Sequence, residues 1–299
     1  LMVVPSDRDI FEFTPIQYPA NDPSSGVITT HFDYNAIQDQ LVKLDILGHD
    51  DPTSLRMLQD LTGVDVRKIP LDDPKTMALF SNTESLQVSP EDIGTSVGSL
   101  GIPEFGTGFV RRMLEEIRPT TFGELVRISG FSHGTNVWTN NAQELIASGI
   151  CTAREAIATR DDIMNYLIQL GMEPGHAFRI MEQVRKGRGL KEEDKVLMRQ
   201  VNTPSWYIDS CEKISYLFPK AHAVAYVIMA FRIAYFKVHH PLAYYATYFT
   251  VRADFDASLA LRSGEELRQM INKIQSKGND ATAKEKNTMT VCEVLVEAK

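Results

Sequence analysis

The pattern of apolar and polar residues changes character near residue 50. Short apolar, β-branched runs predict strands at 2–4, 27–32 and 41–47, and a stretch rich in Pro, Asn, Asp and Ser predicts a loop at 15–26. From about residue 52 onward, helix start and stop signals dominate. The pattern therefore predicts a small piece of β-sheet that leads into a helical region of about 200 residues.

Capping residues and prolines predict where the helices begin and end. Asp51 is expected to cap a helix whose first residue is Pro52, and capping boxes at Thr121, Thr152 and Ser263 predict three more helix starts. Further helices are expected from 90, from 161 or 162 to Gly171, and at 174–186, 204–217 and 221–239, whereas 288–296 fits helix or strand.

These elements predict an α+β fold with two parts, residues 1–62 and residues 63–299. The longest apolar run, 221–236, contains His222 and Arg232, so it is expected to be a buried helix and not a membrane span. Three scattered cysteines without a C-x-x-C spacing argue against a disulfide framework and a zinc site, and they fit a reducing cytoplasm.

Charge is distributed unevenly along the chain. Residues 1–100 hold 16 Asp and Glu against 6 Lys and Arg, a balance of -10, whereas the remaining 199 residues hold 23 against 25, a balance of +2. The acidic part could hold metal ions, or it could simply form a solvated acidic surface.

The most informative segment is the expected strand at 41–47. Side chains alternate along a strand, so Val42, Leu44 and Ile46 would share a core face, while Lys43 and Asp45 would lie on the other face roughly 6–7 Å apart. A carboxylate can hold Mg²⁺ and an ammonium can meet a phosphate oxygen, which suits phosphate chemistry. A surface strand with a local ion pair would show the same alternation.

Several motifs spread over nearly the whole chain resemble the PolC class of bacterial DNA polymerase III alpha subunits. The segment Val42–Thr53 resembles the palm strand that carries the third catalytic aspartate in that family. The other resembling segments are 2–5, 13–22, 129–135, 160–164, 218–226 and 234–241. The resemblance implies the later part of a nucleotidyltransferase-like palm, followed by a mostly helical fingers domain.

The resemblance also implies an activity: addition of a dNTP to the 3′-hydroxyl of a primer, with two Mg²⁺ ions. Asp45 would be one metal-binding carboxylate and Lys43 would neutralise charge on the triphosphate. The family's other two catalytic aspartates form a D-x-D motif upstream, and no such palm motif is present here. With one carboxylate of three, the isolated chain is expected to be inactive. Both chain ends are expected to be cuts through a longer polypeptide, because the chain begins directly at Leu1 and stops inside an apolar pattern at 294–299.

Other candidate site residues follow from the same motifs. Those expected to contact nucleotide are Ser132, His133, Gly134, Arg160, Lys220, His222 and Tyr226. Those expected to contact DNA phosphates are Arg111, Arg112, Arg185, Lys186 and Arg188. Alternatives stay open for each group: 132–134 could be a polar turn, Arg160 could pair with a carboxylate, Tyr226 could be a packed core ring, and the basic clusters could be solvated faces.

Primer-template DNA, dNTP and, through other regions of the parent protein, a sliding clamp and further replisome subunits are the implied partners. The parent would be cytoplasmic and would carry a 3′–5′ exonuclease, of which these residues show nothing. The alternative hypothesis is a non-catalytic helical DNA-binding or interaction module. A metal-dependent hydrolase is a third, without a His/Asp ligand cluster to support it.

Overall fold

Short antiparallel ribbons supply the strands of the first 49 residues. The computed structural model describes residues 1–44, 46, 48–253 and 255–299, and it divides into two compact units, 1–49 and 50–299. In unit 1, β1 (Met2–Val3) pairs with β4 (Val42–Lys43), and β2 (Ile16–Gln17) pairs with β3 (Thr29–Thr30). One short helix, α1 (Tyr34–Ile37), and three 3₁₀ turns, η1 (Ile10–Glu12), η2 (Pro19–Asn21) and η3 (Pro23–Ser25), complete it.

The prediction that one face of the 41–47 segment is buried in a core is wrong within unit 1. Val42, Leu44 and Ile46 are 62%, 46% and 75% exposed. A two-stranded ribbon has too few neighbours to bury either face, so alternation alone did not produce a core here. Among the described residues of this unit, the buried side chains are instead those of Thr14, Ile37 and Leu41.

The regular secondary structure of the described part of unit 2 is mainly helical. Its first seven helices are α2 (Asp50–Thr62), α3 (Pro74–Ala78), α4 (Pro90–Ile93), α5 (Gly108–Ile117), α6 (Phe122–His133), α7 (Gln143–Ala147) and α8 (Arg160–Gln169). The later ones are α9 (Pro174–Arg185), α10 (Glu192–Gln200), α11 (Ser205–Lys213), α12 (Lys220–His239), α13 (Pro241–Thr247), α14 (Ala257–Ala260), α15 (Gly264–Gln275) and α16 (Ala283–Ala298). Together with the ribbons of unit 1, this confirms the α+β prediction.

Local capping signals account for several of the helix starts. Complete capping boxes open α6 at Thr121 and α15 at Ser263, as predicted, and another opens α16 at Thr282. At the start of α8, the Asp162 carboxylate accepts from the N–H of Thr159 at 2.9 Å. The helix predicted from Thr152 is wrong. The Glu155 carboxylate accepts from the N–H and the hydroxyl of Thr152, which is one half of a capping box, but only a turn follows.

The role predicted for Asp51 also needs correction. The residue lies inside the first turn of α2 and is fully buried, and its carboxylate pairs with Arg252. The segment 288–296 is part of α16 and therefore helical.

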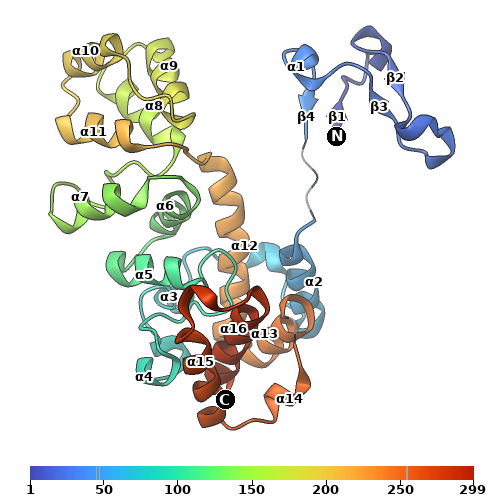
Figure 1. Cartoon of the computed structure of the whole chain (residues 1–299), viewed down its shortest axis with the longest axis vertical. Coiled ribbons are helices and arrows are strands. Elements are labelled where there is room, and N and C mark those ends of the chain that lie inside the picture. Colours follow the sequence, from blue (N-terminus) through green and yellow to red (C-terminus); the bar gives the residue numbers. More distant parts are fainter. Residues whose placement is uncertain (45, 47, 254) are drawn as a thin grey trace. The chain divides into compact units, whose positions relative to one another are not determined.

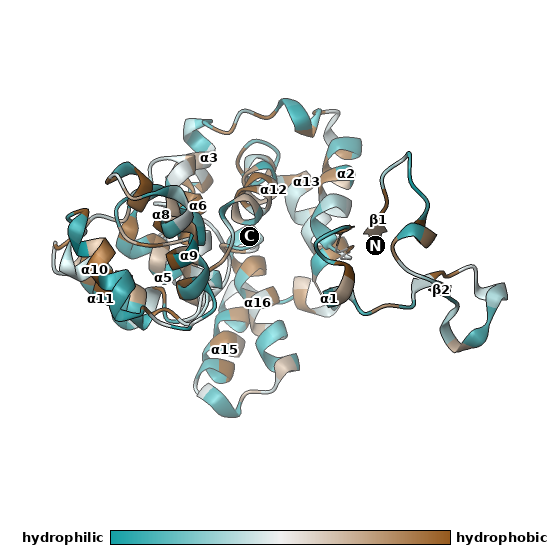
Figure 2. Ribbon diagram, turned by 90° about the horizontal axis from the view of Figure 1, so that it is seen from above, coloured by the Kyte–Doolittle hydropathy of each residue, from teal (hydrophilic) through white to brown (hydrophobic). Residues whose placement is uncertain are grey.

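The long helix α12 organises unit 2 (Figure 1). It packs against α2, α3, α6 and α13, and Figure 2 shows it between α6 and α13. By length and composition α12 could cross a membrane. In the structure, however, it buries Ala223, Val227, Phe231 and Phe236 among the other helices, as the sequence predicted.

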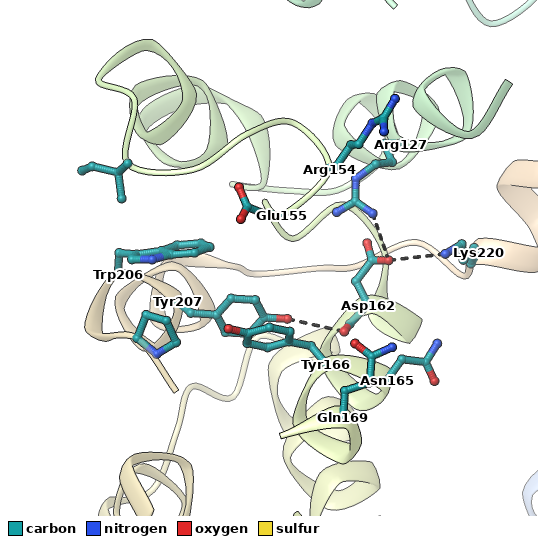
Figure 3. Close-up of a pocket in the computed structure, with 12 residues that line it drawn as sticks. Arg127, Arg154, Glu155, Asp162, Asn165, Tyr166, Gln169, Trp206, Tyr207 and Lys220 are labelled. Atoms are coloured by element: carbon teal, nitrogen blue, oxygen red, sulfur yellow. Dashed lines mark hydrogen bonds and ion pairs between the residues drawn. The ribbon is translucent and has the colours of Figure 1, made fainter. Parts of the chain in front are cut away.

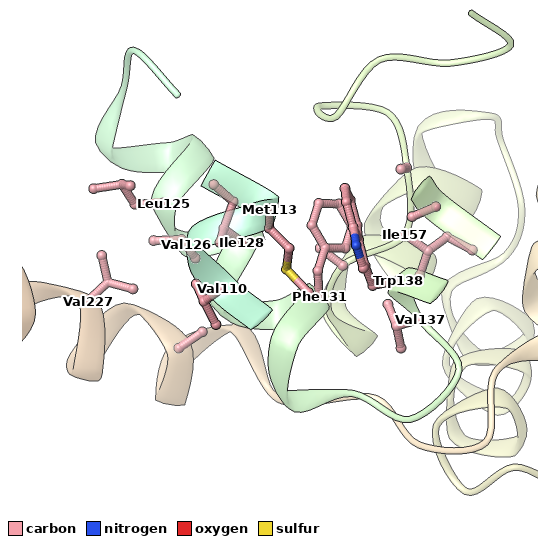
Figure 4. Close-up of a cluster of buried hydrophobic side chains, with 14 of the residues drawn as sticks. Val110, Met113, Leu125, Val126, Ile128, Phe131, Val137, Trp138, Ile157 and Val227 are labelled. Carbon is pink, nitrogen blue, oxygen red and sulfur yellow. The ribbon is translucent and has the colours of Figure 1, made fainter. Parts of the chain in front are cut away.

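Two apolar clusters fill unit 2. The larger one includes buried side chains of α5, α6, α8, α9, α11 and α12. Figure 4 shows a part of it, with Met113 of α5, Phe131 of α6, Val227 of α12 and Trp138 labelled. The smaller cluster joins Leu100 to Leu267 of α15 and Leu295 of α16.

A fully buried ion pair lies beside the smaller cluster. Lys237 Nζ is 2.6 Å from Glu297 Oε1 and donates to the carbonyl oxygens of Gly98 and Leu100, both at 2.7 Å. Burial lowers the pKa of Lys237 and raises that of Glu297, because desolvation opposes both charges.

Candidate nucleotide-binding site

The end of α6 comes unusually close to two neighbouring backbone segments. A Cβ atom on Gly130 would lie 2.5 Å from the carbonyl oxygen of Ala158, and one on Gly134 would lie 3.0 Å from that of Tyr216. Thr135 then forms an antiparallel bridge with Tyr216, with its N–H donating to the Tyr216 carbonyl at 3.0 Å. These contacts require small residues, and they fix the 132–135 turn against the segment that leads into α12.

Hydrogen bonds also tie the start of α8 to the start of α12. The N–H of Arg160 donates to the carbonyl of Phe218 at 3.1 Å, and the N–H of Lys220 donates to Asp161 Oδ2 at 2.8 Å. The ammonium of Lys220 lies 3.6 Å from Asp162 Oδ1. Arg160 and Lys220, which are 60 positions apart in the sequence, therefore meet at one place.

A row of four aromatic rings, which we call the ring row, links these segments: His133, Phe218, His222 and Tyr226. The ring of His133 stacks on Phe218 with centroids 4.9 Å apart, Phe218 meets His222 edge-on at 4.9 Å, and His222 tilts against Tyr226 at 4.6 Å. His133 and His222 are exposed, while Phe218 and Tyr226 are half-buried. Such rings offer π-faces to a base, and imidazoles can add positive charge.

Glu104 controls the electrostatics of His133. The Nε2 atom of His133 lies 2.8 Å from a carboxylate oxygen of Glu104, and Nδ1 lies 2.8 Å from the carbonyl oxygen of Ser129. The hydrogen bond to Glu104 raises the pKa of His133 above its ordinary 6.5, against the opposing effect of burial. Glu104 itself has a φ of 67°, a left-handed conformation that is uncommon for a residue with a side chain.

The structure brings the predicted nucleotide-contact residues together at the adjoining ends of three helices. They are Ser132, His133 and Gly134 at the end of α6, Arg160 at the start of α8, and Lys220, His222 and Tyr226 in the first two turns of α12. The Ser132 hydroxyl already donates to the Ser129 carbonyl at 3.0 Å.

Two residues that the sequence analysis did not assign belong to this group. Phe218 was part of a quoted motif, so its aromatic character in that segment was an available signal. Glu104 lies 29 residues before His133 and has no local signal that connects the two.

Comparison with known proteins decides the family. The family model for the bacterial DNA polymerase III alpha subunit finger domain matches residues 51–203, which is about half of the chain. The chain belongs to this family.

The resemblance to PolC-type members of this finger-domain family is also confirmed. The chain is 62% identical to DNA polymerase III PolC-type of Caldanaerobacter subterraneus subsp. tengcongensis over 298 residues. It is 59% identical to the protein of the same name from Bacillus subtilis and 57% identical to that from Staphylococcus aureus. In each case the match covers 99% of this chain and 21% of the relative, so the chain spans about a fifth of the length of these relatives.

The predicted palm residues of this finger-domain family member lie in unit 1. Lys43 is at the end of β4, and its Nζ lies 4.9 Å from the centroid of the Tyr34 ring. Asp45, predicted to be both catalytic and metal-binding, lies outside the described residues. Among the residues that the structure does describe, no group of three His, Cys, Asp or Glu side chains is placed to hold a metal ion.

The predicted DNA-contact residues fall into two groups in unit 2. On α5, Arg112 is exposed, whereas Arg111 pairs with Glu293 at 3.2 Å and is largely buried. At the end of α9, Arg185 and Lys186 both pair with Glu182, and these cations hold the pKa of its carboxyl down to about 2. Arg188 is exposed. The second group presents more charge to solvent than the first.

Proposed function

We propose that this chain is the late palm and the fingers of a replicative DNA polymerase and that its ring row, with Lys220 and Arg160, receives the incoming dNTP. The observation that carries the proposal is the convergence of three helix ends on one aromatic and cationic group, in a chain of the polymerase III finger family. The PolC-type names of the relatives support the same activity.

The chemistry of the group suits a nucleoside triphosphate. The ammonium of Lys220 and the guanidinium of Arg160 would neutralise phosphate oxygens at the start of α12, where the helix dipole also favours an anion. The Glu104 carboxylate, 2.8 Å from Nε2 of His133, would hold the imidazole in place as part of the ring row. Tyr226 and His222 would stack against the base or the new base pair.

In the complete enzyme this group would serve template-directed addition of the dNTP to a primer 3′-hydroxyl. Two Mg²⁺ ions would stabilise the attacking and leaving oxygens. Asp45 would supply one carboxylate to them and Lys43 would meet the triphosphate. The described residues do not form a two-metal site, so the remaining carboxylates would come from elsewhere in the polymerase. We therefore expect the isolated chain to show no Mg²⁺-dependent primer extension, and robust synthesis would contradict this.

The proposed partners follow from the same role. Arg112, Arg188 and the paired cations Arg111, Arg185 and Lys186 are candidates for contacts with primer-template phosphates. A sliding clamp and other replisome subunits would bind through other parts of the polymerase. The proposed location is the cytoplasm. A 3′–5′ exonuclease would belong to the parent protein and not to these residues.

A segment exchange tests the proposal. The matching 298 residues of the Caldanaerobacter protein would be replaced by this chain, and primer extension by the hybrid would be measured. We expect activity close to that of the parent. An inactive but folded hybrid would refute the proposed function.

Single substitutions in the active hybrid then test the nucleotide site. Lys220→Ala should raise KM for dNTP about tenfold or more, because a charge-assisted contact is lost. The matched control is Lys273→Ala, since Lys273 is exposed on α15. An unchanged KM in Lys220→Ala, with the hybrid still active, would remove Lys220 from the site while leaving the polymerase role intact.

A further inference from the structure

A cavity of about 510 Å³ lies on unit 2 beside the start of α8 and the start of α11 (Figure 3). Its lining comes from α6, the 150–155 turn, α8, the 204–207 segment and the first residue of α12. The volume is in the range of pockets that hold a nucleotide-sized molecule. The four rings of the ring row do not line this cavity, and Lys220 is a residue that the cavity shares with the proposed dNTP site.

One wall of the cavity is aromatic. The rings of Tyr166 and Tyr207 stack with centroids 4.5 Å apart, and Trp206 meets Tyr207 edge-on at 5.4 Å. Tyr207 is buried, and its hydroxyl donates to the carbonyl oxygen of Asp162 at 3.4 Å. Trp206 is half-buried, and Figure 3 shows its indole across the cavity from Glu155 and the arginines. The tyrosine pair therefore supports the wall, and Trp206 can offer a face to a ligand.

Three cations line the same cavity: Arg127, Arg154 and Lys220. Arg127 is fixed, because its guanidinium donates to the carbonyl oxygens of Ala153 and Ala156. Arg154 is exposed, with a single ion pair to Glu124 at 2.9 Å. Arg154 and Lys220 are therefore the cations best able to turn toward a ligand.

The two carboxylates of the lining are already engaged. Glu155 accepts from the N–H and the hydroxyl of Thr152, both at 2.8 Å. Asp162 accepts from the N–H groups of Ala158 and Thr159, at 3.1 and 2.9 Å, and pairs with Arg127. Three cations against two carboxylates leave the lining with a formal balance of +1.

A second cavity of about 490 Å³ shares the same three cations. Its other lining residues come from the start of α6, among them Phe122, and from Val224 of α12. The cations therefore stand between two hollows. A flexible linear polyanion could place successive phosphates against these cations while it passes from one hollow to the other.

We propose that the Trp206 cavity binds one nucleotide unit of a single-stranded nucleic acid, with the base against the indole and its phosphate at Arg154 and Lys220. Asn165 and Gln169 of α8 also line the cavity and offer amide donors and acceptors to the base edge without demanding one sequence. A free nucleoside monophosphate offers the same base and phosphate, so the test must distinguish binding of a single strand from binding of a free nucleotide. The inference does not rest on polymerase activity, because the chain itself can be tested.

Binding of a fluorescein-labelled oligothymidylate of eight residues to the 299-residue chain would be followed by anisotropy. Trp206→Leu should weaken binding roughly 5- to 100-fold, because a stacked base loses its platform. Trp206→Phe keeps a ring and should restore most of the affinity, which a purely structural role would not predict. Circular dichroism would confirm that each variant is folded. Equal affinity of the wild type and Trp206→Leu would overturn the proposal.

The salt dependence tests the cations independently. Arg154→Ala should reduce the slope of log affinity against log salt by about 0.7, because one phosphate contact to a single strand is lost. The matched control is Arg199→Ala on α10, which is exposed and does not line the cavity. An unchanged slope in Arg154→Ala would overturn the proposal. The proposal would also be overturned if thymidine monophosphate competed as well as the oligomer at equal nucleotide concentration, because the site would then bind free nucleotides.

Discussion

Replacing Lys237 by methionine should cost unit 2 much of its stability. The substitution keeps the length of the side chain but removes two hydrogen bonds of 2.7 Å to the carbonyls of Gly98 and Leu100 and the 2.6 Å contact with Glu297. Both members of the ion pair have fully buried side chains, so solvent cannot replace the lost partner. Breaking a buried pair from one side typically costs about 3–5 kcal/mol.

The remaining contacts of Glu297 explain why the cost should be near this range. After the substitution its carboxylate would keep one hydrogen bond, from the Tyr245 hydroxyl at 2.9 Å. Its other oxygen, Oε2, has no hydrogen-bond partner even in the intact pair. The carboxyl group would have to take up a proton or move out of the interior, and either change loosens α16.

Urea unfolding followed by tryptophan fluorescence measures the loss, because both tryptophans, Trp138 and Trp206, are in unit 2. The double variant with Glu297→Gln should be less destabilised than the sum of the two single variants, since the second change removes the stranded charge. A loss below about 1 kcal/mol for Lys237→Met, or strict additivity, would refute the reasoning.

Two further predictions concern α6 and its surroundings. Glu104→Gln should lower the pKa of His133, which NMR titration of the ring would measure. Because this pKa is raised above 6.5 in the folded chain, the contact with Glu104 stabilises the fold fully below pH 6.5, and this stabilisation is lost as the pH rises through the folded-state pKa. A variant that is equally destabilised at pH 5.5 and at pH 9 would contradict this reasoning. Gly130→Ala should destabilise unit 2 by about 1–3 kcal/mol in thermal or urea unfolding, because its Cβ would lie 2.5 Å from the Ala158 carbonyl oxygen. Gly123→Ala, in the same helix with its nearest neighbouring atom at 4.0 Å, should be neutral or slightly stabilising, and equal effects at both glycines would argue against the steric explanation.

Features that depend on adjacent residues were predictable from the sequence. The capping boxes at Thr121 and Ser263 formed as expected, because donor and acceptor are three residues apart and need no tertiary partner. At Thr152 only the contacts of the Glu155 carboxylate with Thr152 formed, and no helix follows. There the guanidinium of Arg127, which is 26 positions before Ala153, donates hydrogen bonds to the carbonyl oxygens of Ala153 and Ala156. In a helix these oxygens would accept from backbone N–H groups.

Long-range partners explain the remaining differences. The position of Asp51 before Pro52 suggests a helix cap, but its carboxylate pairs with Arg252, which lies 201 residues later in the chain. The contact of Glu104 with His133 depends on a left-handed backbone at a non-glycine residue, which no propensity indicates. The residues predicted to contact nucleotide were selected because each lies within a recognisable motif. The fold brings these motifs together, and their contact with nucleotide stays a prediction.

The length of α12 gives the molecule a mechanical property. It runs for 20 residues, about 30 Å, and its interior contains no glycine or proline at which it could bend. His222 and Tyr226 are near one end, while Lys237 is clamped near the other. Because the helix has no bending point and packs against α2, α3, α6 and α13, a ligand that displaces its first turns would push the helix as a unit against these neighbours and against the contacts of Lys237.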